Sequence, residues 1–103
     1  MKGVAILSTY PNKKSIQKIA NELVHSKIVA CVNITKISSV YSWQGKIEYT
    51  DEYLAIFKTT HKNKTKLKNQ IKKTHPYEVP EMAELKLQNL NKPYLDWLAD
   101  STS

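Results

Sequence analysis

The amino-acid sequence predicts an α+β domain in which four antiparallel strands are backed by two helices on one face. Strand and helix patterns follow one another in the order βαββαβ, two neighbouring strands share a short turn, and a last helical pattern closes the chain. A chain of 103 residues has the length of one domain, so residues 1–103 are predicted to share a single core.

The first strand and helix are predicted from a change in hydrophobic spacing. Residues 3–10 are apolar at successive positions, as in a strand that is covered on both faces. Pro11 ends this run, and Asn12 is a suitable N-cap for the helix that follows. The core-facing positions of that helix recur at helical spacing and are Ile16, Ile19, Ala20, Leu23 and Val24.

The middle of the chain is predicted to form a hairpin that is longer than its own domain. The first arm runs from Ile28 to Trp43, the turn lies at Gln44-Gly45, and the return arm reaches Thr60. The first arm would extend about 50 Å, whereas a domain of this length is roughly 35 Å across. The hairpin must therefore bend at a bulge, with Ser38-Ser39 as the candidate, or project onto a neighbour.

Large side chains near the hairpin tip favour projection onto other copies of the chain. Tyr41, Trp43, Ile47 and Tyr49 lie there, where exposed apolar surface and unpaired strand edges both attract another chain. Symmetric association through the arms would cover both features, so a closed homo-oligomer is predicted.

A second helix, a short strand and a terminal helix complete the predicted fold. The helix spans residues 62–74 and docks through Leu67 and Ile71. The segment EMAELKLQN alternates as a strand should, and Pro93 opens the helix PYLDWLAD. The complete order is that of the ferredoxin-like, split βαβ arrangement with an added C-terminal helix.

The charge balance suggests an alternative function. Sixteen basic residues against nine acidic ones give a net charge of +7, which suits nucleic acid or anionic lipid. A nucleic-acid or membrane-surface protein that uses the lysine-rich helix Lys62–Lys73 is therefore the alternative. Every basic residue is a lysine, however, and lysine lacks the planar fork that reads bases, so nucleic acid is not the favoured partner.

The same composition bears on location. The sequence contains no apolar run of membrane-spanning length and no signal-peptide pattern. Its single cysteine, Cys31, has no internal disulfide partner and fits a reducing compartment. A cytoplasmic protein without a membrane span is predicted.

The stretch THPYEVPEM contains the strongest candidate for chemistry. Pro76 and Pro80 stiffen it, and His75 is either a copper or zinc ligand or a hydrogen-bonded structural residue. Cys31 is either a core residue or a soft-metal ligand, the latter only if His75 or a partner chain comes near. Lys58 ends an apolar strand run and is expected beside the His75 joint, with Glu52 as a possible ion-pair partner.

Catalytic motifs are missing from the sequence. Two glycines cannot build a phosphate-binding loop, and no nucleophile-elbow or zinc-protease pattern occurs. The chain is therefore predicted not to be an enzyme.

The motifs ACVNI, SVYSWQGKIE, AIFKTT, HPYEVPEM and YLDWL closely resemble those of the CutA divalent-cation tolerance proteins. The resemblance covers nearly the whole chain. It implies a ferredoxin-like subunit in a homotrimer similar to the PII-type signal proteins. It also implies a role in tolerance of, or response to, copper and other divalent metal ions, with no cofactor required.

The resemblance also implies site residues. In relatives proposed to bind copper, the ligands are a first-strand cysteine and two adjacent histidines before Pro-Tyr, where this chain has Ser8, Thr74 and His75. Cys31 matches a second family cysteine, so His75 and Cys31 are the candidate metal ligands. A cleft between subunits is expected to hold a small polar ligand or metal complex, unless its residues serve the interface alone. The predicted cleft residues are Trp43, Glu48, Glu52, Lys58, Tyr77, Tyr94 and Trp97.

Overall fold

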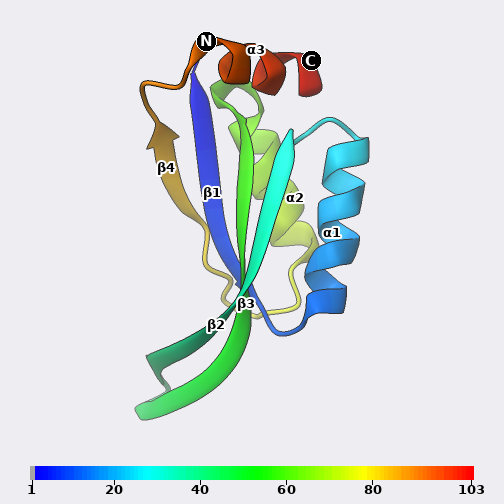
Figure 1. The fold of residues 1–103 in the computed structure, drawn as a ribbon. Coiled ribbons are helices and arrows are strands. Elements are labelled where there is room, and N and C mark those ends of the chain that lie inside the picture. Colours follow the sequence, from blue (N-terminus) through cyan, green and yellow to red (C-terminus); the bar gives the residue numbers. More distant parts are fainter. Residues whose placement is uncertain (1) are drawn as a thin grey trace.

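The computed structural model describes residues 2–103 and has the predicted order of elements (Figure 1). The sheet is fully antiparallel with the strand order β2-β3-β1-β4. Helices α1 and α2 cover one face, and α3 lies across one end of the sheet (Figure 1). The ferredoxin-like fold class is confirmed. The elements are β1 (Gly3–Tyr10), α1 (Lys13–His25), β2 (Cys31–Trp43), β3 (Lys46–Thr60), a 3-10 turn (His61–Asn63), α2 (Lys64–Thr74), β4 (Ala83–Leu87) and α3 (Lys92–Ser101).

The core lies between the sheet and the two helices that cover it. Alternate residues of β1 and β3 point toward α1 and α2, because side chains on a strand alternate between its faces. The buried residues of this core include Ile6, Tyr10, Ala55, Phe57, Ile16, Ile19, Leu23, Leu67 and Ile71. Asn12 caps α1 as predicted, since its Oδ1 accepts a hydrogen bond from the Ser15 N–H at 2.8 Å.

One predicted core position is wrong. Val24 is 41% exposed, although it continues the helical spacing of Ile16, Ile19 and Leu23. A helix turns about 100° per residue, so Val24 lies about 80° from Ile16 and about 100° from Leu23. It therefore falls on the flank of the apolar stripe, outside the part that meets the sheet.

The opposite face of the sheet, here called the open face, is also apolar. The register places Ala5 beside Leu85, and Leu7 beside both Ile56 and Ala83, all on the side away from α1 and α2. Leu85 is 50% exposed. The alternation predicted for β4 is confirmed, and its leucines lie on the open face, whereas Glu84 faces α2.

The β2–β3 hairpin projects from the sheet and contains no bulge. Its pairing runs without interruption from Cys31 opposite Lys58 to Trp43 opposite Lys46, so the bulge considered at Ser38-Ser39 is wrong. The arms curve away beyond the ends of β1 and β4 (Figure 1). The molecule is consequently elongated, with extents of 45 × 26 × 21 Å. Projection is therefore the alternative that the structure adopts.

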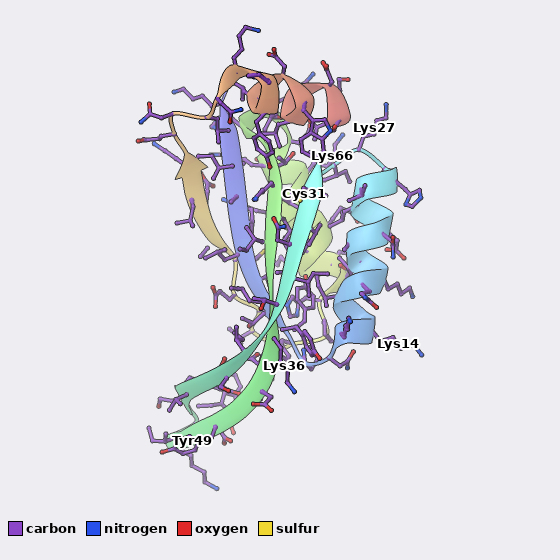
Figure 2. The ribbon with its side chains drawn as sticks, in the orientation of Figure 1. Lys14, Lys27, Cys31, Lys36, Tyr49 and Lys66 are labelled. Carbon is purple, nitrogen blue, oxygen red and sulfur yellow. The ribbon has the colours of Figure 1, made fainter. Side chains whose placement is uncertain are left out.

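The hairpin turn has the geometry that a right-twisted two-strand ribbon favours. Gln44 and Gly45 have φ values of +50° and +79°, as the two central residues of a type I′ turn require. Tyr49 lies near the tip, far from the helices (Figure 2), and is 77% exposed. The tip therefore leaves large side chains in water.

Three predicted boundaries differ from the observed ones. The first hairpin arm begins at Cys31 and not Ile28, because the N–H groups of Ile28 and Val29 both donate to the Leu23 carbonyl that closes α1. The second helix begins with a 3-10 turn, and its α-helical part starts at Lys64. Strand β4 is limited to residues 83–87, since Pro80 precedes it and Asn89 has a φ of +57°.

Candidate functional site

His75 is fixed by hydrogen bonds to both of its ring nitrogens. Its Nδ1 lies 3.0 Å from the backbone nitrogen of Tyr77, and its Nε2 lies 2.8 Å from the Thr9 carbonyl oxygen. A backbone N–H can only donate, so Nδ1 accepts, and Nε2 carries the proton that is donated to Thr9. The ring also stacks on Tyr10 with centroids 4.2 Å apart. His75 is thus a neutral imidazole that ties the end of α2 to β1.

This arrangement bears on the two roles predicted for His75. A metal ligand needs a free lone pair on an imidazole nitrogen, and the single lone pair of this tautomer is already shared with the Tyr77 N–H. Burial lowers the pKa of His75, an effect partly opposed by the Thr9 carbonyl and by the charge of Glu52. The geometry matches the structural role.

Cys31 does not come near His75 within one subunit. His75 contacts Thr9, which lies opposite Leu54, whereas Cys31 lies opposite Lys58, four residues further along β3. Four residues of strand span about 13 Å. Figure 2 shows Cys31 near the start of β2, far from the hairpin tip. Within residues 2–103, no group of three or more His, Cys, Asp or Glu side chains is placed to hold a metal ion.

Tyr77 and Glu52 form a second tie at the same joint. The Tyr77 hydroxyl donates to Oε2 of Glu52 at 2.6 Å, and Glu52 is only 6% exposed. Burial raises the pKa of Tyr77 above its usual range, and the hydrogen bond to the Glu52 carboxylate raises it further. The stretch THPYEVPEM is therefore a stiff joint pinned to β1 by His75 and to β3 by Tyr77.

A cavity of about 460 Å³ extends from this joint along the hairpin as far as Trp43, beside the turn. We call it the hairpin cavity. Its wall combines apolar, aromatic and acidic side chains from β2, β3 and the joint. The lining residues are Thr9, Ile37, Ser39, Val40, Tyr41, Trp43, Glu52, Leu54, Tyr77, Val79 and Glu81.

The hairpin cavity gathers three of the predicted cleft residues, namely Trp43, Glu52 and Tyr77. Glu48 is half-buried and lies opposite Tyr41 in the register, outside the cavity wall.

The other predicted cleft residues lie elsewhere within the subunit. Tyr94 and Trp97 belong to α3, which covers the opposite end of the sheet, and their rings lie 5.5 Å apart. A single cleft that joins them to the hairpin residues is not formed within one subunit. Such a cleft between subunits stays a prediction.

Within one subunit, the expected position of Lys58 beside the His75 joint is wrong, whereas its place in a cleft between subunits stays a prediction. Lys58 lies opposite Cys31 and Ala5, and six residues of β3, about 20 Å, separate it from Glu52. It cannot pair with Glu52 of its own subunit, where the hydrogen-bond partner of Glu52 is Tyr77. The reason is topological: α2 runs back along the sheet, so the joint at its C-terminus lies beside the C-terminal end of β1 and the middle of β3, and Lys58 lies near the end of β3 that is far from the hairpin tip (Figure 1).

Sequence reasoning missed two contributors to this region. Tyr41 lines the hairpin cavity with Trp43, and Tyr10 supplies the ring on which His75 stacks. The sequence could have predicted the place of Tyr41 beside Trp43, because residues two apart on a strand share a face. The contact of Tyr10 with His75 required the tertiary structure, since the two residues are 65 positions apart in the sequence.

The lysine-rich helix gives the alternative function no support. Lys64 and Lys68 are paired with Glu84 of β4 at 3.3 and 2.7 Å, so two of its lysines are neutralised within the subunit. These hydrogen bonds lower the pKa of Glu84. Over the part of the chain that the structure describes, no helix has both the length and the apolar character needed to cross a bilayer.

The fold and the cavity define a class of protein: a ferredoxin-like α+β subunit whose long hairpin lines an acidic, aromatic cavity. The chain belongs to the family described as CutA1 divalent ion tolerance protein, whose model matches residues 4–101.

Relatives and solved structures agree with this assignment. The divalent-cation tolerance protein CutA of Thermotoga maritima is 37% identical over 98 residues, which are 95% of this chain and 97% of the relative. Human protein CutA is 39% identical, covering 95% of this chain and 55% of its own length. The crystal structure of CutA1 from Pyrococcus horikoshii superposes with a TM-score of 0.93 at 34% identity, covering 97% of this chain and 98% of the other.

Proposed function

We propose that this chain acts as a homotrimeric, non-enzymatic divalent-cation tolerance protein whose hairpin cavities become ligand-binding clefts between subunits. The observation that carries the proposal is the apolar open face beside a projecting hairpin. Leu7, Leu54, Ile56 and Leu85 lie on that face, which α1 and α2 leave uncovered. Removal of such apolar surface from water by another subunit favours the assembled protein.

The hairpin cavity lies on the same side of the sheet. Glu52 and Leu54 in its wall are open-face positions of β3, continuous with Ile56. Packing of a second copy against the open face would consequently close the cavity from one side. Assembly and ligand binding are coupled in this proposal, because the neighbouring subunit completes the cleft.

The oligomeric state can be tested with one substitution and a matched control. Leu85→Lys places a charge on the open face at a position that is half-exposed in the isolated subunit, so the subunit is expected to fold but not to assemble. Val24→Lys makes the same change on the outer flank of α1, where Val24 is 41% exposed, and is expected to leave assembly intact.

Sedimentation and native mass spectrometry would report the outcome. The wild type and Val24→Lys are expected to contain three 11.8 kDa subunits, and Leu85→Lys one. A wild-type monomer at micromolar concentration would contradict the proposal.

We further propose that copper or another divalent ion, where it binds, does so between subunits and without the His75 ring. Two observations support this. Both ring nitrogens of His75 already take part in hydrogen bonds, and Cys31 lies about 13 Å further along the sheet than the strand position that His75 contacts. Calorimetry with Cu(II) and Zn(II) should give His75→Ala the affinity of the wild type. A tenfold loss in that variant would show that the ring leaves its hydrogen bonds to bind metal.

A cytoplasmic location is also proposed, supported by the lone cysteine. A solved relative from Archaeoglobus fulgidus is described as a periplasmic divalent cation tolerance protein, which makes cell fractionation the appropriate test. Recovery of the chain with periplasmic markers would overturn this part of the proposal.

A further inference from the structure

The wall of the hairpin cavity is acidic, although the chain as a whole is strongly basic. Sixteen lysines and nine acidic residues give the protein a net charge of +7. Among the eleven residues that line the cavity, however, two are carboxylates, Glu52 and Glu81, and none is a lysine or histidine. The local charge is therefore opposite in sign to the overall charge and favours a cationic ligand.

Glu52 is a buried carboxylate without a cationic partner in the described chain. It is 6% exposed, and its Oε2 accepts the Tyr77 hydroxyl at 2.6 Å. Within the single subunit its Oε1 accepts no hydrogen bond from residues 2–103 and is not fully enclosed, and no lysine or histidine nitrogen of these residues lies within 4.0 Å of the carboxylate. Burying a carboxylate costs free energy unless a positive group compensates it. A cation bound in the cavity would supply that compensation.

The aromatic walls indicate which kind of cation fits. Tyr41 and Trp43 line the cavity and are each 41% exposed in the isolated subunit, so either a ligand or a neighbouring copy can contact parts of both rings. Aromatic faces attract organic cations, and Ile37 and Val79 add apolar surface for an alkyl chain. The volume of about 460 Å³ lies within the usual range for small-molecule sites.

A hard divalent ion fits this wall less well. Such ions take about six or more oxygen ligands, and residues 2–103 provide no group of three or more acidic, histidine or cysteine side chains arranged for a metal. An alkylammonium ion needs one charged acceptor and apolar or aromatic surface beside it. The hairpin cavity offers both.

We propose that the hairpin cavity binds a primary alkylammonium group, with Oε1 of Glu52 as its charged acceptor and the rings of Tyr41 and Trp43 along its alkyl chain. Tyr77 holds the Glu52 carboxylate in place through Oε2. The inference rests on the proposed function, because this cavity is the ligand cleft of that proposal, and it names the chemical class of the ligand.

Tryptophan fluorescence can test the inference on the assembled protein. The chain has two tryptophans, so Trp97→Phe leaves Trp43 as the sole indole and its emission as a report on the cavity wall. Because Trp97 is itself a predicted cleft residue, calorimetry on the wild type checks that this background binds the amine equally well. The probes are n-pentylammonium and 1-pentanol, which share the alkyl chain and differ in charge. The amine is expected to change the fluorescence of Trp43 in a saturable way, and the alcohol is expected to bind at least tenfold more weakly.

Two variants, each of which replaces one glutamate by glutamine, provide the matched comparison. Glu52→Gln keeps an acceptor for Tyr77 but removes the charge, and is expected to weaken n-pentylammonium binding at least tenfold. Glu78→Gln removes a charge from the same joint outside the cavity wall and is expected to change binding less than twofold.

Three results would overturn the inference: no saturable response to the amine, equal binding of amine and alcohol, or equal affinity in Glu52→Gln and the parent. The first includes the case in which a lysine of a neighbouring copy already fills the cavity. The amine–alcohol comparison needs only the Trp97→Phe background and decides the matter even if Glu52→Gln fails to fold. A trimer that binds no amine would refute the inference alone, whereas a monomer would refute the proposed function.

Discussion

The backbone N–H of Tyr77 donates a hydrogen bond to Nδ1 of His75 across 3.0 Å, which requires the imidazole to be neutral. A proton on Nδ1 would place two N–H groups face to face and would also charge a ring that is stacked on Tyr10. Burial acts in the same direction and lowers the pKa of His75. The joint between α2 and β4 is therefore sensitive to acid.

The first prediction concerns stability against pH. The folded-state pKa of His75 lies below its unfolded value of about 6.5, so the unfolded chain binds more protons between the two values. The contribution of the neutral ring is present above the unfolded pKa and is lost as the pH falls through the folded pKa. The free energy of unfolding of the wild type should thus decrease as the pH falls from 7.5 toward 5.5.

Two histidine variants would check this prediction by urea unfolding across that range. His75→Gln removes the titrating group and should flatten the dependence. His25→Gln alters an exposed ring at the end of α1 and should leave the wild-type slope. An unchanged slope in His75→Gln would count against the neutral-ring account.

A second prediction concerns acid below the histidine range. Lys68 and Lys64 lower the pKa of Glu84, so the contribution of this carboxylate is present above its unfolded pKa of about 4.5 and is lost as the pH falls through the lowered value. Lys68→Met should make the free energy of unfolding less dependent on pH between about 5 and 3. Because the ion pair is at the surface, added salt should reduce the difference between variant and wild type.

Lys66→Met is the control for this change. Lys66 lies on the same helix and forms no salt bridge within residues 2–103. If both variants altered the acid dependence equally, the effect would come from net charge and not from the Lys68–Glu84 contact.

The third prediction isolates the conformational cost of the hairpin turn. A Cβ at Gly45 would meet no atom within 4 Å, yet φ there is +79°. Gly45→Ala should therefore lower the free energy of unfolding by about 1 kcal/mol through backbone strain alone. Gln44→Asn should raise it, because asparagine tolerates the positive φ of +50° better. Chemical unfolding would measure both, and no loss in Gly45→Ala would mean that the turn changes type.

The fourth prediction contrasts two buried hydroxyls. Ser8 is fully buried and its Oγ has no hydrogen-bond partner within residues 2–103, whereas Thr59 Oγ1 donates to the Ile28 carbonyl at 2.6 Å. Ser8→Ala should leave the free energy of unfolding unchanged or raise it by up to about 1 kcal/mol, since no hydrogen bond is lost. Thr59→Val should lower it by about 1–3 kcal/mol, because a buried carbonyl loses its donor. Urea unfolding of both variants would measure the contrast.

The neighbouring hydroxyl of Tyr10 helps to interpret that experiment. Burial raises the pKa of Tyr10 to about 12, and the nearby Ser8 hydroxyl slightly opposes this shift without reaching hydrogen-bond geometry. A marked loss of stability in Ser8→Ala would reveal a hydrogen bond between the two hydroxyls, or to a buried water, in solution.

The amino-acid sequence by itself determined the order of the elements, the turn at Gln44-Gly45 and the cap at Asn12. Each of these features depends on residues that are close in sequence. The hydrophobic period sets the order of the elements, Gly45 accommodates the positive φ of the turn, and the Asn12 side chain reaches a backbone N–H three residues away. The motifs of the chain were also sufficient to assign its family. Hairpin length followed from counting residues along each arm.

Only the tertiary structure decided which of the candidate residues meet. His75 meets the carbonyl of Thr9 and the ring of Tyr10, far from it in sequence, because α2 runs back toward the C-terminal end of β1 before the chain reaches the joint. The same path of α2 brings the joint, and with it Tyr77, to Glu52 and not to Lys58, which lies six residues further along β3. Such pairings depend on where folded elements end in space, which local spacing along the chain does not specify.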